Sequence, residues 1–296
     1  MKTICVFNQK GGVGKTTTTV NLSTALSDKE KKVLMVDMDP QANATTGVGI
    51  EKNDLEKTIY DLFFYEKEDE FKNGDFLIKS EEHNNLDILP SNSLLSGLEV
   101  ELVGFENREL ILKEILERFE KDYDFIIIDC PPSLGLLSIN SLVASDSVLI
   151  PIQSEYYALE GVGQLIKTYD MVKDNLNKNL EIEGVLLTMT DMRNNLSIEV
   201  IEEVKAYFKS KVFSTMIPRN IKLAEAPGFG KSILDYEKKA KGSIAYKRLA
   251  DEIIENNKNF KRKVDIKNEE DELDLNFFDK DENLKEDDKM EIDNEK

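Results

Sequence analysis

A glycine-rich loop close to the N-terminus places the strongest constraint on what this chain can fold into. Residues 10–17 have the sequence KGGVGKTT; they follow an apolar run over residues 3–7 and precede a segment, 20–26, with apolar residues at helical spacing. A strand, a glycine-rich loop, Gly-Lys-Thr and a helix form the context of a phosphate-binding loop. Glycines let successive backbone N–H groups turn toward one anion, and the helix N-terminus adds its positive end. The predicted phosphate site consists of Lys10, Gly11, Gly12, Val13, Gly14, Lys15, Thr16 and Thr17.

The loop contains two lysines, Lys10 and Lys15. Lys15 is expected to reach the β- and γ-phosphates of a nucleotide, and the Thr16 hydroxyl to ligate Mg²⁺. The standard pattern places a glycine where this chain has Gln9, and it lacks the second lysine, Lys10. Lys10 is either a solvated loop residue or a charge on the phosphates. Its position next to the phosphate cradle favours the second interpretation.

Two further aspartates follow predicted strands. Residues 32–37 form an apolar run that leads into Asp39, and residues 123–129 form a continuous apolar run that ends in Asp129. Ligands of open α/β sheets bind outside the carboxyl ends of the strands. Asp39 is therefore predicted to face the phosphates as a catalytic residue, and Asp129 to hold Mg²⁺ through water. The alternative for both is a simple helix-capping acid.

The order of apolar segments predicts an α/β fold with a doubly wound, mostly parallel sheet flanked by helices, because strands alternate with helices along the chain. Strands are expected over residues 3–7, 32–37, 86–90, 123–129, 147–152, 184–189 and 212–217. Helices are expected over residues 20–26, 58–64, 91–102, 107–119, 155–172, 197–208 (with a serine cap) and 243–254, and a loop and helix over 218–227.

Charge divides the 296 residues into an ATPase-like domain, 1–256, and an acidic tail, 257–296, predicted to be disordered. The formal net charge is −19, and residues 261–296 hold 15 acidic and 8 basic residues. A chain with this much negative charge is not expected to bind nucleic acid through its overall charge. Any DNA contact therefore needs a local basic patch. Four apolar residues interrupt the tail and form either a docking motif or an incidental cluster: Leu273, Leu275, Phe277 and Phe278.

Composition and the remaining special residues indicate a cytoplasmic protein. No apolar run approaches the roughly 20 residues that span a bilayer, and the first strand leaves no room for a signal peptide. Cys5 and Cys130 lie at predicted strands and are expected to be buried and reduced. The single histidine, His83, lies in a polar stretch and is expected to be an exposed loop residue.

Four stretches together resemble the ParA/Soj-type partitioning ATPases, over about residues 1–256. They are residues 7–12 (FNQKGG), 37–41 (DMDPQ), 128–132 (IDCPP) and 217–227 (IPRNIKLAEAP). The loop resembles the signature K-G-G-x-G-K-[ST] of the deviant P-loop ATPases. The tail is not part of the family pattern.

The resemblance implies an ATP-dependent switch, a slow, partner-stimulated ATPase that uses Mg²⁺. ATP-bound monomers would pair face to face, and the homodimer would bind nucleoid DNA without sequence specificity until a ParB-type centromere-binding partner stimulates hydrolysis. Lys10 would contact the nucleotide of the opposite subunit, Asp39 would position or activate water, and Pro218 and Asn220 would hold the adenine. The implied DNA surface contains Arg193, Arg219 and Lys222. These three cations are otherwise ordinary solvated surface, and Arg219 has the further alternative of bracing the adenine loop.

Three rival classes share parts of this pattern. A MinD-like cell-division ATPase, the main alternative, ends in a basic amphipathic membrane helix. In this chain the basic stretch 260–264 is short and soon becomes acidic, so no membrane partner is expected. A nitrogenase-reductase-like electron carrier needs cluster cysteines between subunits, whereas Cys5 and Cys130 lie at strands. A non-catalytic scaffold is expected to lose Lys15, Asp39 or Asp129, and this chain has all three.

Overall fold

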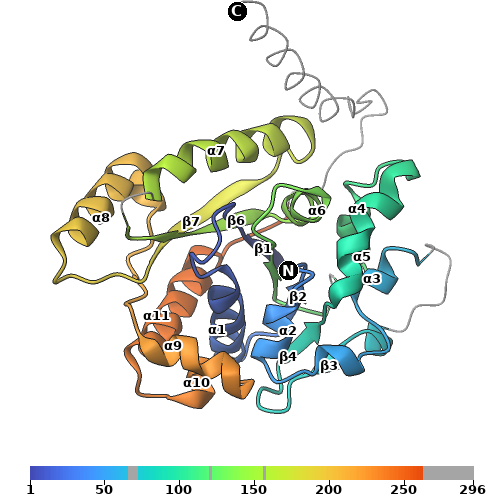
Figure 1. Cartoon of the computed structure of the whole chain (residues 1–296), viewed down its shortest axis with the longest axis horizontal. Coiled ribbons are helices and arrows are strands. Elements are labelled where there is room, and N and C mark those ends of the chain that lie inside the picture. Colours follow the sequence, from blue (N-terminus) through green and yellow to red (C-terminus); the bar gives the residue numbers. More distant parts are fainter. Residues whose placement is uncertain (66–72, 120–121, 156–157, 263–296) are drawn as a thin grey trace, which may run out of the picture.

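A seven-stranded sheet forms the centre of the computed structural model, which describes residues 1–65, 73–119, 122–155 and 158–262 (Figure 1). The strand order is β3-β4-β2-β5-β1-β6-β7. All neighbours are parallel except β3, which is antiparallel to β4. The strands are β1 Lys2–Val6, β2 Val33–Asp37, β3 Ile78–Lys79, β4 Leu86–Leu89, β5 Phe125–Asp129, β6 Ser147–Gln153 and β7 Glu181–Thr188.

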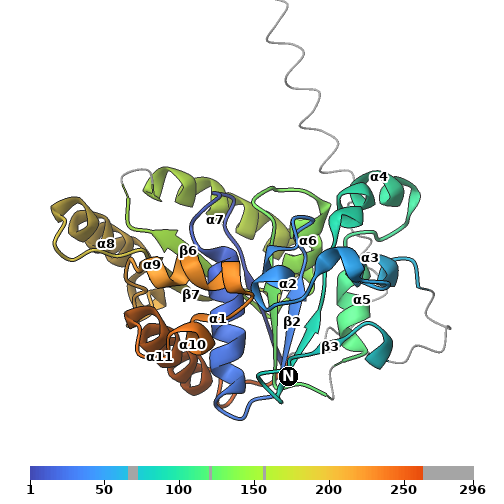
Figure 2. The same cartoon turned by 60° about the horizontal axis from the view of Figure 1, so that its bottom comes forward.

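Helices cover both faces of the sheet (Figures 1 and 2). Buried side chains of α1, α10 and α11 pack on one face, and those of α5, α6, α7 and α8 on the other. The helices are α1 Lys15–Ser27, α2 Asn43–Gly47, α3 Ile59–Leu62, α4 Leu98–Glu101, α5 Ile111–Glu117, α6 Leu136–Val143, α7 Ala158–Asn175, α8 Asn195–Phe208, α9 Ile221–Glu225, α10 Ile233–Tyr236 and α11 Lys241–Asn256. The predicted doubly wound fold is confirmed.

Strand β1 shows why the sequence folds this way. Its five residues are all buried, and alternate side chains enter opposite layers: Ile4 packs with the α1 and α11 layer, and Cys5 with the α5 to α8 layer. A strand covered on both faces is expected to be largely apolar, as Ile4, Cys5 and Val6 are. The register aligns Val6 of β1 and Asp37 of β2 with Asp129 of β5. Three carboxyl ends therefore meet at one edge of the sheet, which positions the site.

The expected strand over residues 212–217 is wrong as a regular strand. In the described chain this stretch forms isolated parallel bridges, Val185 with Val212 and Thr190 with Pro218, rather than a continuous ladder with β7. The reason is local, because the backbone N–H groups of Ser214 and Thr215 donate to the Glu252 carboxylate instead of to a strand.

Helix boundaries between residues 91 and 119 also differ from those expected. The stretch 91–102 is broken into a 3-10 turn over Ser93–Gly97, the single turn of α4, and a further 3-10 turn over Leu102–Gly104. Helix α5 begins at Ile111 rather than at residue 107.

The predicted serine cap of α8 is wrong, since Asn194 accepts the capping hydrogen bond from the Leu196 backbone N–H, whereas Ser197 accepts from the Asp191 N–H outside the helix. Ser197 is buried, and its hydroxyl donates to the Ser154 hydroxyl.

His83 is not the exposed loop residue that the polar sequence around it suggests. Its side chain is 10% exposed and lies between two carboxylates, with Nδ1 3.0 Å from Asp28 and Nε2 2.9 Å from Asp235. These contacts join the turn before β4 to the end of α1 and to α10. A polar stretch gives no sign of such long-range pairing, because its partners are 55 and 152 residues away in sequence.

Residues after α11 return to the sheet before the described chain ends. Asn257 donates to Glu183 at 2.6 Å, the Lys2 ammonium lies 4.0 Å from the centre of the Phe260 ring, and Arg262 lies 3.1 Å from Asp146. The start of the predicted tail is therefore packed on the domain. Residues 263–296, with the predicted docking motif, lie outside the described residues.

Candidate nucleotide-binding site

The glycine-rich loop is held in shape by residues of neighbouring strands. Gly12 and Gly14 have φ angles of 74° and 92°, in the left-handed region that glycine adopts without strain. Asn8 accepts from the Lys10 backbone N–H at 3.0 Å and donates to the Pro151 carbonyl at 2.8 Å. Thr188 of β7 donates to the Val13 carbonyl at 2.9 Å. The loop is thus preorganised by β6 and β7, and neither Asn8 nor Thr188 was expected from the motif.

Lys15 is the first residue of α1 and is only 7% exposed. Its ammonium donates to the Lys10 carbonyl at 3.0 Å. Burial lowers the pKa of Lys15, while the nearby Asp129 carboxylate acts to raise it. A bound phosphate would add negative charge beside this ammonium and favour its charged form. The position of Lys15 fits its predicted contact with phosphate.

The two predicted magnesium residues lie in direct contact. The Thr16 hydroxyl donates to Asp129 Oδ2 at 2.8 Å, and Thr19 donates to Oδ1 at 3.1 Å. Burial raises the pKa of Asp129, and the Asp37 charge raises it further, while the two threonines act against this rise. Hydroxyl and carboxylate oxygens are hard ligands of the kind that Mg²⁺ prefers, and a divalent cation would relieve the buried negative charge. The residues present therefore fit Mg²⁺.

Asp39 lies just beyond β2 and is 7% exposed. Its Oδ1 accepts from the Gln41 backbone N–H at 2.9 Å, and its carbonyl accepts from the Ser91 hydroxyl. These contacts fix the loop after β2 at the same edge of the sheet as the glycine-rich loop. The structure thus brings Asp39, Asp129 and Lys15 together, as predicted.

Asp37 is a site residue that the sequence analysis did not single out. It is fully buried and accepts three hydrogen bonds, from the Asp39 backbone N–H at 3.1 Å and from the Thr45 backbone N–H and hydroxyl at 2.8 and 2.7 Å. Burial raises the pKa of Asp37 to about 6, although the hydrogen bonds act to lower it. Its position as the last residue of a wholly apolar strand was the available signal. Asp37 holds the loop that carries Asp39.

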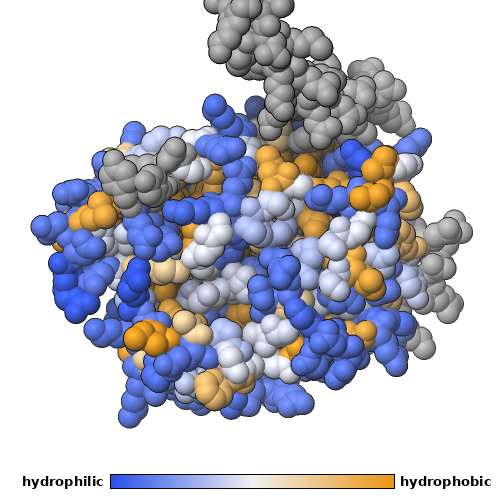
Figure 3. Space-filling view, in the orientation of Figure 1, coloured by the Kyte–Doolittle hydropathy of each residue, from blue (hydrophilic) through white to orange (hydrophobic). Residues whose placement is uncertain are grey.

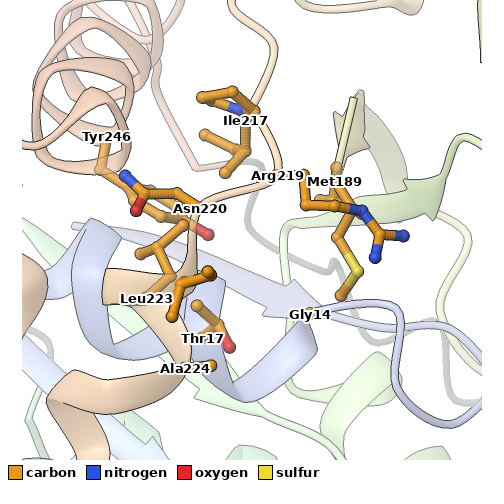
Figure 4. A pocket seen from close by; sticks show the side chains of 12 residues that line it. Gly14, Thr17, Met189, Ile217, Arg219, Asn220, Leu223, Ala224 and Tyr246 are labelled. Carbon is orange, nitrogen blue, oxygen red and sulfur yellow. The ribbon is translucent and has the colours of Figure 1, made fainter. Parts of the chain in front are cut away.

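A cavity of about 300 Å³ opens beside the glycine-rich loop and has the size and lining of a base pocket (Figure 4). Pro218 and Asn220, the residues predicted to hold the adenine, both line it. The sequence analysis missed other lining residues, among them Met189, Leu223 and Tyr246. The cavity also contains Gly14, Thr17, Thr188, Ile217, Arg219, Ile221 and Ala224.

Comparison with known proteins agrees with this geometry. A family model described as an AAA domain matches residues 1–182. The chain is 54% identical over 255 residues to the sporulation initiation inhibitor protein Soj of Bacillus subtilis, covering 86% of this chain and 99% of that protein. It is 49% identical over 251 residues to the chromosome partitioning protein ParA of Myxococcus xanthus, covering 85% and 87%. The chain belongs to the ParA/Soj family.

Solved structures extend the comparison of this ParA/Soj chain to bound nucleotide. Cobyrinic acid a,c-diamide synthase from Mycobacterium smegmatis, with bound ADP and magnesium, superposes with a TM-score of 0.76 at 33% identity, covering 88% of this chain and 96% of that one. The septum site-determining protein MinD from Pyrococcus horikoshii, complexed with Mg-ADP, superposes with a TM-score of 0.68 at 26% identity, covering 85% and 95%. In the part of the chain that the structure describes, no helix is long and apolar enough to cross a membrane.

Lys10, the signature lysine of the ParA/Soj pattern, differs from Lys15 in its surroundings. It is half-buried, and among the described residues its side chain has no ion-pair partner. It is thus available to a charge outside its own subunit. This availability is what the predicted contact across a dimer requires.

Each of the predicted DNA-binding residues is paired with an acid. The Arg193 side chain is 90% exposed, and its guanidinium donates two hydrogen bonds to the Asp191 carboxylate. Arg219 lies 3.0 Å from Glu155, and Lys222 lies 2.7 Å from Glu225. Arg219 also lines the base cavity, which agrees with its alternative role beside the adenine. Exposed pairs of this kind are weak, so a phosphate competes with the carboxylate for each cation.

The cysteines occupy the positions that were expected. Cys5 and Cys130 are both buried and unbridged, with 3.0 Å between their sulfur atoms. Burial raises the pKa of the Cys5 thiol well above its usual range. Their place as small core residues under the site is confirmed.

Proposed function

We propose that this protein is an ATP-dependent switch for DNA partitioning in the cytoplasm, on the nucleoid. The observation that carries the proposal is the convergence of Lys15, Thr16, Asp39 and Asp129 beside a base-sized cavity, in a chain that is 54% identical to Soj. The reaction is hydrolysis of ATP to ADP and phosphate. The names of the relatives, which include chromosome partitioning proteins, support the biological role.

Hydrolysis of this kind requires positioning and charge neutralisation. Lys15 and the loop N–H groups bind the β- and γ-phosphates, and Pro218 and Asn220 hold the adenine. Thr16 and Asp129 hold Mg²⁺, which neutralises phosphate charge when bound. Asp39 orients the attacking water, and Asp37 fixes the loop that carries Asp39. A slow basal rate follows if the site is complete only in the dimer.

Dimerisation and DNA binding extend the same proposal. Lys10 contacts the nucleotide of the opposite subunit in an ATP-bound homodimer. Arg193, Arg219 and Lys222 then exchange their carboxylate partners for DNA phosphates, without sequence specificity. A ParB-type centromere-binding protein stimulates hydrolysis and so releases the dimer from DNA. No membrane contact is needed.

Steady-state ATPase assays test the proposal, with and without DNA and the neighbouring ParB-type protein. We expect a slow basal rate that rises when both are added, and no activity in Lys15→Ala protein. A wild-type rate that neither addition changes would contradict the switch. Parallel co-sedimentation with DNA and with anionic vesicles separates the MinD-like alternative, which predicts ATP-dependent binding to the vesicles.

A further inference from the structure

A basic groove lies where α9 faces the start of α11. We define it by Lys239, Lys241 and Arg248, together with the apolar Ile221 and Ile244. Two adjoining cavities form it, of about 500 and 550 Å³, and Lys241 lines both. The two cavities therefore adjoin at Lys241 and together extend from α9 to α11.

The three cations that define the basic groove differ in pairing from Arg219 and Lys222, which line the same cavity. Lys239, Lys241 and Arg248 are exposed, and none has an ion-pair partner among the described residues. One acid, Glu237, also lines the groove, so the net charge of its wall is positive. These cations lack the neutralising partners that Arg219 and Lys222 have.

Apolar surface accompanies this charge. The Ile221 side chain is 75% exposed and that of Ile244 is 44% exposed. Figure 3 shows apolar side chains exposed over α9 with hydrophilic side chains around them. A surface that combines free cations with exposed isoleucines is complementary to an acidic segment that also carries apolar residues.

The chain itself contains such a segment. Residues 269–282 hold eight acidic residues and one lysine, and they include Leu273, Leu275, Phe277 and Phe278. In an extended chain, Leu273, Leu275 and Phe277 point to one side. The match with Soj covers 99% of that protein but 86% of this chain, so part of this chain has no counterpart there.

We propose that residues 269–282 bind the basic groove of the same chain. Acidic side chains pair with Lys239, Lys241 and Arg248, and the alternate apolar side chains cover Ile221 and Ile244. The chain after Arg262 is long enough to reach back to the groove at the start of α11. Its 34 residues span up to about 110 Å when extended, whereas the 16 residues of α11 rise only about 24 Å. Because the segment is tethered, its effective concentration is high and weak contacts suffice. When bound, it shields the groove from other polyanions.

Carbodiimide cross-linking of the full-length chain, read out by mass spectrometry, tests this contact because it joins amines directly to touching carboxylates. At low salt we expect Lys239 and Lys241 to be linked to carboxylates of residues 269–282 within one chain. The links should be lost at 0.5 M salt, where the screening length is about 4 Å.

Arg248→Glu provides the sharper comparison, because it reverses a groove charge without removing a reactive amine. We expect the Lys239 and Lys241 links to fall about fivefold. Lys167→Glu is the matched control, an exposed lysine of α7 on the opposite face of the sheet, and should leave the links unchanged. Links spread evenly over surface lysines, or unaffected by Arg248→Glu, would overturn the proposal.

DNA binding by the same full-length protein separates this inference from the proposed function. Replacing Glu269, Glu270 and Glu272 with glutamine and Asp271 with asparagine should tighten DNA binding about fivefold at low salt, and less as screening grows. Cross-links in a protein that does not bind DNA would contradict the proposed function and still support the docking. Absence of the cross-links in a protein that binds DNA in the presence of ATP would contradict the docking and still support the proposed function.

Discussion

The nucleotide-binding centre and the basic groove hold their charges in different ways. In the centre, Lys15 and Asp129 are 7% and 0% exposed, and their polar atoms are engaged by the Lys10 carbonyl and by Thr16. In the groove, Lys239 and Lys241 are exposed and unpaired within the described chain. A buried charge without its partner costs several kcal/mol, so the centre tolerates one geometry. Exposed charges act through a field that salt screens, so the groove accepts any anion of suitable shape.

This difference predicts how each region responds to mutation. Substitutions in the centre should produce large losses that salt does not alter. Substitutions on the surface should produce small changes that depend on salt or pH.

Among variants that still bind ATP, the largest effect on turnover is expected for Asp39→Ala. The side chain lies at the edge of the sheet that carries the glycine-rich loop, and its carboxylate accepts a hydrogen bond from the Gln41 backbone N–H. Its removal should spare ATP binding and dimerisation and lower hydrolysis by roughly 100-fold or more, trapping the dimer on DNA. Phosphate release and nucleotide titration, measured on the same protein, check this. Hydrolysis at the wild-type rate would remove Asp39 from the water-positioning role.

Lys10→Ala tests whether the half-buried, unpaired lysine of the loop acts outside its own subunit. We expect monomers to bind ATP as before and ATP-dependent dimers to be lost. Size-exclusion chromatography with light scattering, in a slowly hydrolysed ATP analogue, provides the measurement. If the variant dimerises normally, Lys10 is a solvated loop residue.

Lys222→Ala should weaken binding to all DNA sequences alike and leave ATPase activity without DNA intact. Each phosphate neutralised contributes a slope of about −0.9 in log K against log salt, so the loss of two copies in a dimer should make the slope shallower by about 2. Filter binding over a salt series measures the slope. Glu225→Gln is the matched control, because it frees Lys222 from its 2.7 Å partner and should not make the slope shallower. An unchanged slope in Lys222→Ala would remove Lys222 from the DNA surface.

The smallest effect is expected at His83, which lines neither the base cavity nor the basic groove. The hydrogen bond to Asp235 raises the pKa of His83, burial opposes this rise, and the charges of Asp235 and Asp28 add to it. A raised folded pKa means that the stabilisation is fully present below the unfolded value of about 6.5 and is lost as the pH rises through the folded value. His83→Gln should therefore lower the free energy of unfolding by about 1–3 kcal/mol at pH 6, and by less at pH 9. Urea unfolding at both pH values measures this, and a pH-independent difference would contradict it.

The same contrast explains what the sequence could predict. The meeting of strand ends at one edge of the sheet could be predicted from the apolar runs that end in Asp37 and Asp129. Burial on both faces of a strand leaves this clear pattern in the sequence. Local capping and pairing left no such pattern in the sequence. The Glu252 carboxylate binds residues 214 and 215 and keeps them out of a regular strand. Asn8 and Thr188 support the loop through hydrogen bonds between segments that are distant in sequence. The pairing of Arg219 with Glu155 was likewise invisible, since it depends on the tertiary fold.

The central claim is that nucleotide in the buried centre controls DNA binding at the surface. DNA co-sedimentation of wild-type and Lys15→Ala protein, with ATP, with ADP and without nucleotide, tests it most directly. Loss of the charged hydrogen bonds of Lys15 should weaken ATP binding on the order of 100-fold. We predict that wild-type protein sediments with DNA only in ATP and that Lys15→Ala protein does not sediment under any of the three conditions. DNA binding that is equal with and without ATP, or that survives in Lys15→Ala protein, would contradict the account.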